Sequence, residues 1–313
     1  MRMKRGRQGG LYLTRAPVES AASALATYLC AIGCTAEDLR QTARVAQPLL
    51  AELPEGAMLR ILCEHTQYLF ATGDIAATED SPRGTLIALR LLTDLPTIPE
   101  PGRALGFEAE LCERFHCSRA TFRQALRVLD DLGMLQVRRG RGGGYLLKRP
   151  SRIGMIRRLF TLFASWQLSL HEIVQMTWVL NLVNLRLCVQ NLQLLAANEQ
   201  MLRCDRMEAV LVGTPEPQRW TRLQQQLERT AASRLANTLL NCAVAYYARL
   251  GRPFAPWSAI EQPMLRLEQQ LVRSLRGGDG QEAERATRRA QTLVSRLLGV
   301  PDLPWPNALL GAP

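Results

Sequence analysis

The sequence predicts a mainly α-helical protein with one short β-hairpin inserted among its helices. Hydrophobic residues make up 47% of the 313 residues but aromatic residues only 6%, which is typical of helical proteins rather than β-sandwiches. Apolar residues recur at helical spacing along most of the chain, and two short strand-like runs, Leu135–Arg138 and Tyr145–Lys148, flank the glycine run 140–144.

Several classes of protein are disfavoured by composition. No uninterrupted apolar stretch reaches the length of about 18 residues that a membrane span needs, so we expect no membrane association. Gln8-Gly9-Gly10 stands where a signal peptide has its apolar run, which predicts a cytoplasmic protein. The eight cysteines show no CxxC spacing and are expected to be buried small hydrophobes, with a redox switch or a thiolate metal site as the alternatives.

The charge balance suits a polyanionic partner. The chain has 39 Lys and Arg against 28 Asp and Glu, a formal net charge of +11. Lys4 and Lys148 are the only lysines, however, and a GC-rich genome would produce the same excess of arginine. The location of the positive charge therefore matters more than its total.

An internal repeat divides the chain. At a fixed offset of 134 residues, the loop and strand Arg5–Leu13 align with Arg139–Leu147, and the match continues without a gap through Thr35–Leu39 on Ser169–Ile173. Each copy reads as a basic glycine loop, a strand, a helix, and a Thr or Ser cap that opens a second helix. The first copy adds one helix at 57–72; the second continues through helices expected at 159–165, 170–195, 219–250, 263–275 and 280–298.

Between the copies lies the segment that predicts a function. Helical patterns at 84–94, 107–115 and 119–132 precede the two strands, and Gly133 stands at the expected end of the third helix. The order helix, helix, turn, helix, strand, glycine turn, strand is that of a winged helix-turn-helix. The complete predicted fold is mainly α, with a winged helix-turn-helix followed by an all-α helical bundle and preceded by a partial helical repeat.

The side chains of this segment suit DNA. The second helix of a helix-turn-helix presents its first residues to the major groove, and here Ser118 is a good N-cap while Arg119, Thr121 and Arg123 are exposed by spacing. Arginine can grip guanine or phosphate with two donors, and threonine can contact a phosphate or a thymine methyl. The glycine hairpin adds candidate backbone contacts at Arg138, Arg139, Arg141 and Gly142.

Residues 111–144 resemble the GntR family of bacterial regulators, through the run Leu111–Leu126, Leu129, Leu132–Leu135 and the Arg-Gly motif 139–144. The helices after Pro150 are similar to the FadR-type effector domain of that family. The resemblance implies a homodimer on a palindromic operator, with a small-molecule effector in the helical domain. It divides the chain into a partial first copy (1–76), a winged helix-turn-helix (77–150) and an effector and dimerisation domain (151–313).

Three departures from the family pattern bear on function. The first copy begins inside a wing, so either the start codon is misplaced or the chain is a degenerate tandem member. Ala109 stands where the family has a base-contacting arginine, which removes about 1–3 kcal/mol of discrimination. The metal-binding Asp and His of many relatives fall on Gln224, Glu228 and a position near Glu268, so a three-His site cannot form and no metal or other cofactor is expected. The alternative is a hard cation held by Glu228 and Glu268.

The other distinctive residues have weaker interpretations. His65 and His171 are expected to be structural, and His116 lies in the turn before the predicted recognition helix, with a phosphate contact as the alternative. Aromatic residues of the helical region are expected in the core, with the lining of an apolar ligand pocket as the alternative: Trp166, Trp178, Tyr246, Tyr247 and Trp257.

Two functions of different classes follow from the sequence. The leading hypothesis is a ligand-responsive DNA-binding regulator. The alternative is a truncated pseudo-regulator, a dimerisation module with little DNA affinity of its own. The absence of a DNA-binding domain (a reader) from the first copy and the presence of Ala109 favour this alternative. An enzyme is not expected, because the sequence has no phosphate loop, nucleophile elbow, HExxH motif or acid/base pair.

Overall fold

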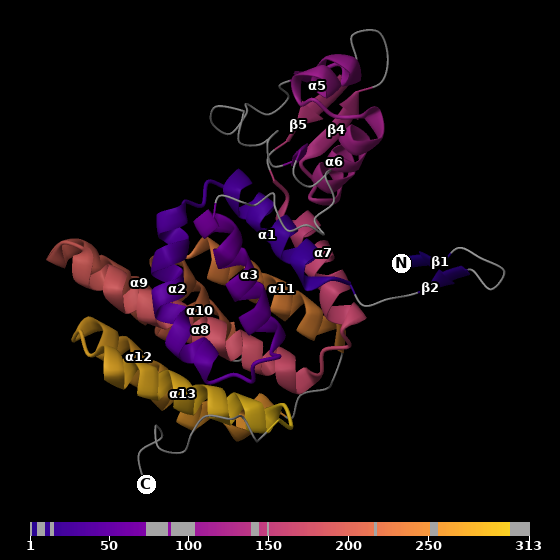
Figure 1. Ribbon diagram of the computed structural model, residues 1–313. Coiled ribbons are helices and arrows are strands. Elements are labelled where there is room, and N and C mark those ends of the chain that lie inside the picture. Colours follow the sequence, from indigo (N-terminus) through magenta and orange to yellow (C-terminus); the bar gives the residue numbers. More distant parts are fainter. Residues whose placement is uncertain are drawn as a thin grey trace. The chain divides into compact units, whose positions relative to one another are not determined.

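The computed structural model confirms the mainly helical fold (Figure 1). It describes residues 2–4, 10–12, 16–72, 87–88, 104–138, 144–148, 150–215, 218–250 and 256–300. The chain divides into two compact units, one formed by 1–40 and 58–168 and the other by 41–57 and 169–313. Within the described ranges, no helix is both long and apolar enough to cross a membrane.

The first unit contains the winged helix-turn-helix. Its elements are β3 (Ala104–Gly106), α5 (Glu108–Arg114), α6 (Arg119–Asp131), β4 (Leu135–Arg138) and β5 (Gly144–Leu147). The strands form an antiparallel sheet of order β3-β5-β4, in which Leu135 pairs with Leu147 and Arg138 with Gly144. Helices α5 and α6 and strands β4 and β5 confirm the sequence prediction to within a residue or two. Strand β3 was not predicted, and the helix expected at 84–94 lies outside the described residues apart from the helical pair Ile87 and Ala88.

The core of this part forms under α6. Phe122, Leu126 and Leu129, the apolar face of the helix, are all buried. The Phe122 ring packs edge-on against Tyr145 of β5, with ring centroids 6.1 Å apart. The opposite face of α6 is therefore left to solvent.

The end of α6 is joined closely to α7 (Arg152–Ser165). Gly133, at φ +68°, ends the helix in a left-handed conformation that favours glycine. Gly154 lies so near the end of α6 that a Cβ there would stand 2.4 Å from the Leu132 carbonyl carbon. Only glycine permits this approach of the two backbones.

The remaining elements of the first unit come from the N-terminal region. They are β1 (Arg2–Lys4), β2 (Gly10–Tyr12), α1 (Val18–Ala31) and α3 (Met58–Thr72), and α3 confirms the helix predicted at 57–72. Helix α1 packs against both α3 and α7. The contact with α7 includes the Trp166 Nε1–H, which donates to Ala16 O at 2.8 Å, and the Ala16 N–H, which donates to Ser165 Oγ at 3.1 Å.

Local structures recur at the offset of the sequence repeat. Strand β1 pairs with β2 in the register Lys4↔Gly10, and β4 pairs with β5 in the register Arg138↔Gly144, 134 residues later. Helices α1 and α7 both have 14 residues, and their first residues, Val18 and Arg152, are separated by the same interval.

The turns and caps after α1 and α7 also correspond. Gly33 (φ +78°) and Gln167 (φ +54°) both adopt the left-handed conformation just beyond the helix. The following helices are then capped alike: Thr35 Oγ1 accepts from the Asp38 N–H at 3.1 Å, and Ser169 Oγ from the Glu172 N–H at 3.2 Å.

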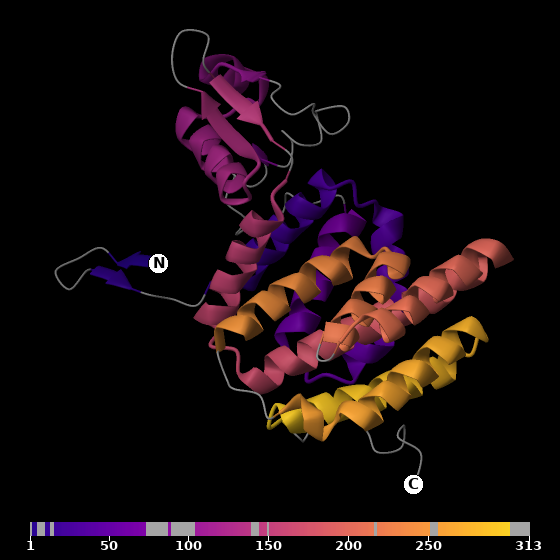
Figure 2. The same ribbon diagram turned by 180° about the vertical axis from the view of Figure 1, so that it is seen from behind.

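The second unit is a helical bundle. It contains most of α2 (Ala36–Ala51) together with α8 (Leu170–Leu194), α9 (Ala197–Gly213), α10 (Gln218–Ala231), α11 (Arg234–Leu250), the 3₁₀ turn η1 (Trp257–Ala259), α12 (Glu261–Arg276) and α13 (Gly280–Leu297). The long helix α8 packs against α10, α11 and α13, which explains why its residues are mostly buried. Helices α12 and α13 lie side by side in both views (Figures 1 and 2).

Two predictions for this bundle were wrong. The single helix expected at 219–250 is broken, because Ala232 takes a positive φ of 54° and Ser233 Oγ caps α11 by accepting from the Ala236 N–H at 3.1 Å. Helix α9 was not predicted. It has an irregular apolar pattern and exposes Met201, Leu202 and Val212.

Five of the eight cysteines are buried, as the structural interpretation predicts, whereas Cys30, Cys112 and Cys117 are half-buried. All eight are free thiols. Burial is the largest effect on Cys63, Cys188 and Cys242 and raises the pKa of each to about 12. These three thiols stay protonated at neutral pH, which disfavours a redox role for them.

Candidate nucleic-acid interface and ligand cavity

The start of α6 is fixed by a side-chain cap. Ser118 Oγ accepts a hydrogen bond from the Thr121 N–H at 3.1 Å, and the Ser118 and Thr121 hydroxyls lie 2.8 Å apart. Ser118 is therefore the N-cap that its position in the sequence predicts. Thr121 is half-buried as a residue and its hydroxyl lies beside that of Ser118, so its first role is to order the helix end.

The exposed face of α6 carries arginine. Arg119, the first residue of the helix, is exposed, and no partner for its guanidinium is found in the part of the chain that the structure describes. Gln124 and Arg127 are also exposed, whereas Phe122 and Leu126 point into the core. The described surface of α6 can thus present hydrogen-bond donors to a flat or grooved partner.

The charges of α6 run against the helix dipole. Its cations, Arg119, Arg123 and Arg127, begin at the N-terminus, while its last turn carries Asp130 and Asp131 and no basic residue. The N-terminus of a helix is the positive end of its dipole, so acids would be the stabilising choice there. Arginines at the N-terminus and acids at the C-terminus lower the stability of the helix by itself. Such a distribution of charge is expected where the arginines bind an anionic partner.

Arg123 makes an ion pair that the sequence analysis missed. Its Nε–H donates to Glu108 Oε1 at 3.0 Å and its Nη2–H to Oε2 at 3.4 Å, while the Arg123 side chain remains 65% exposed. The Tyr145 hydroxyl also donates to Glu108 Oε2, at 3.4 Å. Burial first, and then the Glu108 carboxylate, raise the pKa of Tyr145. Glu108, on the preceding helix α5, thus orients the Arg123 side chain. The two residues are 15 positions apart, so no local sequence pattern reveals the contact.

The hairpin completes the candidate interface only in part. Arg138 is exposed at the end of β4, directly before the turn. The other predicted contacts in the hairpin, Arg139, Arg141 and Gly142, lie outside the described residues.

The histidines have separate environments. His116 is exposed and adopts a φ of 47° in the turn before α6. His65 Nδ1 makes a 2.9 Å hydrogen bond with Ile61 O, one turn earlier in its helix, and His171 is half-buried at the start of α8.

The acidic residues considered for a metal do not form a cluster. No group of three potential ligands among His, Cys, Asp and Glu occurs in the described ranges. Glu268 is fully buried on α12 and accepts from the Arg219 Nε–H of α10 at 2.5 Å. A guanidinium therefore supplies positive charge to this carboxylate.

A cavity of about 500 Å³ opens within the bundle of the second unit. Trp178, Tyr247 and Trp257 line it, as the pocket alternative for the aromatic residues predicted, whereas Trp166 and Tyr246 do not. Trp220, which the sequence analysis did not single out, lines it as well. The remaining lining comes from α8, α10, α11 and the end of α13: Val174, Thr177, Asn181, Thr221, Gln224, Gln225, Glu228, Leu240, Asn241, Val244, Val294 and Leu298.

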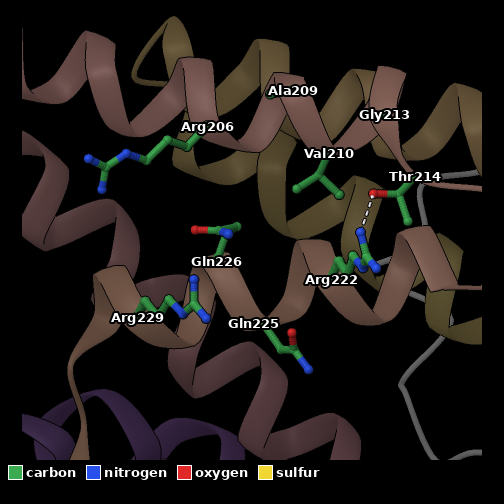
Figure 3. A pocket seen from close by; sticks show the side chains of 9 residues that line it. All are labelled: Arg206, Ala209, Val210, Gly213, Thr214, Arg222, Gln225, Gln226 and Arg229. Carbon is green, nitrogen blue, oxygen red and sulfur yellow. Dashed lines mark hydrogen bonds between the residues drawn. The ribbon is translucent and has the colours of Figure 1, made fainter.

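A second hollow, of about 390 Å³, has a different chemistry (Figure 3). It lies between α9 and α10 and is lined by Arg206, Arg222 and Arg229, all of which are exposed. The Arg222 Nη1–H donates to Thr214 Oγ1 at 3.4 Å. The hollow is thus a cationic surface, distinct from the aromatic cavity.

Comparisons with known proteins agree with the geometry of the first unit. Residues 87–143 match the family described as bacterial regulatory proteins, gntR family. No curated protein matches the chain. Among solved structures, Streptococcus agalactiae GntR is similar, with 19% identity and a TM-score of 0.44 over 69% of this chain and 97% of that chain. The capped helix α6, the hairpin β4–β5 and the family match agree in placing a gntR-type helix-turn-helix domain within residues 87–143.

Proposed function

We propose that this protein is a sequence-specific, DNA-binding transcription regulator whose helical bundle responds to a small ligand. The observation that supports it most directly is the surface of α6, where exposed arginines begin at the capped N-terminus and acids lie at the far end. Arginines at the N-terminus are unfavourable for the helix in isolation, and the negative charge of a DNA phosphate backbone would compensate them. No enzymatic role is proposed.

In the proposed complex, α6 enters the major groove. Arg119 and Arg123 contact base edges or phosphates near its N-terminus, and Ser118 and Thr121 hold that end of the helix in place. Arg138 and the hairpin residues Arg139, Arg141 and Gly142 lie along the adjacent backbone. Each reader recognises half of a palindromic site, so we propose a homodimer.

DNA binding is tested by a gel-shift titration with a duplex from the region upstream of the protein's own gene, repeated at rising salt. We expect specific binding whose affinity falls steeply with salt, because phosphate contacts release counterions. Arg119→Ala should weaken specific binding at least tenfold. Arg206→Ala is the matched control, since it removes the same charge from an exposed position on α9 and should bind as the wild type.

The competing function gives a different result. A pseudo-regulator that serves mainly as a dimerisation module, which Ala109 favours, would show no shift at micromolar protein. Equal effects of Arg119→Ala and Arg206→Ala would mean that α6 is not the recognition helix.

We further infer that residues 1–72 are a shortened copy of the segment that follows the winged helix. The equal registers of β1–β2 and β4–β5, the equal lengths of α1 and α7 and the similar caps after them support this. The proposed organisation is a partial copy at 1–76, the reader at 77–150 and a FadR-like effector and dimerisation domain at 151–313. A tandem protein of this kind would act in the cytoplasm, where the bacterial chromosome lies.

The aromatic cavity is the proposed effector site. It has the size and mixed apolar and polar lining of small-molecule sites, and α8, α10, α11 and α13 all contribute to it. A ligand there would contact most of the bundle and could favour one arrangement of its helices over another.

A further inference from the structure

The walls of the cavity are suited to a flat aromatic molecule. Trp178, Trp220 and Trp257 belong to three separate elements, and Tyr247 adds a fourth ring. Such rings offer large apolar faces with well-defined stacking geometry. Trp178 is only 5% exposed, so its side chain is fixed before any ligand arrives.

Four of the polar side chains that line the cavity are amides, and two buried ones have no partner among the described residues. Asn181 and Gln224 are 7% and 6% exposed, respectively, and neither side chain makes a hydrogen bond there. Gln224 Nε2 and Trp257 Nε1 are fully buried donors for which the described residues supply no acceptor. Buried polar groups are rarely left unsatisfied, so these donors indicate a missing acceptor.

The charge of the described lining disfavours an anion. Glu228 is its only acidic residue, and no Arg, Lys or His lines the cavity in the described part of the chain. A carboxylate ligand would bring a second negative charge into a largely apolar space without a cation to balance it. A simple ammonium ion would lack the acceptor that Gln224 and Trp257 require.

We propose that the cavity binds an uncharged aromatic molecule that carries a carbonyl or equivalent acceptor. Its ring stacks among the tryptophans, and its acceptor oxygen receives hydrogen bonds from Gln224 and Trp257. The terminal torsion of the glutamine side chain is soft, so its amide can turn toward the bound oxygen. The assignment rests on the proposed function, in which this cavity is the effector site.

Three probes that share the indole ring system but differ in charge test the assignment: neutral indole-3-acetamide, anionic indole-3-acetate and cationic tryptamine. Binding is followed on the full chain without DNA, by tryptophan fluorescence and by the shift in Tm. A fragment of this size is expected to bind with a Kd of about 1 mM or tighter. The neutral amide should bind at least tenfold more tightly than either charged probe.

Two variants separate ligand recognition from folding. Gln224→Leu should weaken binding of the amide at least fivefold. It should also leave the unliganded Tm equal or higher, because it replaces a buried unpaired amide with an apolar group of similar size. Asn181→Leu should behave in the same way. A residue with only a structural role would lower the Tm on replacement and leave the preference among the probes unchanged.

The arginine hollow provides the internal control. If indole-3-acetate binds and Arg206→Ala with Arg229→Ala abolishes that binding while the amide is unaffected, the anion occupies the hollow and the assignment stands. Binding of the acetate to the cavity as tight as that of the amide would overturn it, as would the failure of the amide to bind. The DNA titration is independent, so failure of one proposal is distinguishable from failure of the other.

Discussion

At the residue scale, the two leading arginines of α6 differ in their surroundings. Arg119 is exposed without a partner in the described part of the chain, whereas Arg123 pairs with Glu108. The Arg123 side chain is 65% exposed, and exposed pairs of this kind contribute only about 0–1 kcal/mol. The pair is therefore too weak to withhold Arg123 from DNA, and its bidentate geometry orients the guanidinium instead.

A double-mutant cycle tests this positioning role. Arg123→Ala should weaken specific DNA binding at least tenfold, and Glu108→Gln should weaken it less, since only the orientation of the arginine is lost. The double variant should bind as Arg123→Ala does, because Glu108 acts through Arg123. Affinities from gel-shift titrations at fixed salt provide the measurement.

Tyr145→Phe is the control for the cycle, since it removes one hydrogen bond to Glu108 and leaves the ion pair in place. Additive losses for Glu108→Gln and Arg123→Ala would show that the two residues contribute separately. Tighter specific binding by Glu108→Gln would show that the carboxylate competes with DNA.

At the element scale, α10 and α12 are joined by the buried Arg219–Glu268 pair. Their side chains are 9% and 0% exposed, so each charge depends on the other for compensation. The pair occupies a position where the family resemblance implied a metal ligand near Glu268. In this bundle a guanidinium and a carboxylate link the two helices.

Removal of one partner should therefore be severe. Arg219→Met leaves the Glu268 carboxylate buried without its guanidinium and is expected to lower the free energy of unfolding by about 3–5 kcal/mol. The double variant Arg219→Met with Glu268→Leu should recover most of this loss, since both charges are then gone. Urea unfolding followed by circular dichroism measures both values. If the single variant were as stable as the wild type, the buried pair would not be needed to join α10 and α12.

The elements also show what a sequence can reveal. Helix α6 was predictable because its cap, amphipathic face and terminal glycine agree, and β4 and β5 because a glycine turn separates them. Strand β3 has only three residues and exists through its pairing with β5, which no local signal indicates. The break at Ala232 was hidden by continuous helical patterning, although Ser233 was available as a cap.

The candidate sites follow the same division. The cap by Ser118 and the exposure of Arg119 were predictable because both follow from position on one helix. Glu108 was missed because its contact with Arg123 depends on how two helices pack. The cavity was predicted only as an alternative to core packing, since aromatic residues in a helical sequence look alike whether they fill a core or line a pocket.

At the scale of the whole molecule, the proposed organisation is one of two unequal copies. The described residues contain one winged helix-turn-helix, together with a second hairpin, β1–β2. A palindromic operator presents two half-sites about one helical turn apart. One chain can fill one of them, so the proposed regulator needs a second chain.

The stoichiometry of the DNA complex is thus a prediction. Two chains should bind one operator duplex, and the mass of the complex, measured by light scattering after size exclusion, should correspond to that ratio. A duplex with one half-site scrambled should bind much more weakly. A saturated complex of one chain per duplex would contradict the homodimer and leave the hairpin β1–β2 to be considered for the second half-site.

The approach of Gly154 to Leu132 has a mechanical consequence. The first turn of α7 and the last turn of α6 meet backbone to backbone, with no intervening side chain that could change rotamer and absorb a displacement. A displacement of the first turn of α7 is therefore expected to move the end of α6 directly, without the rearrangement of any side chain between the two backbones.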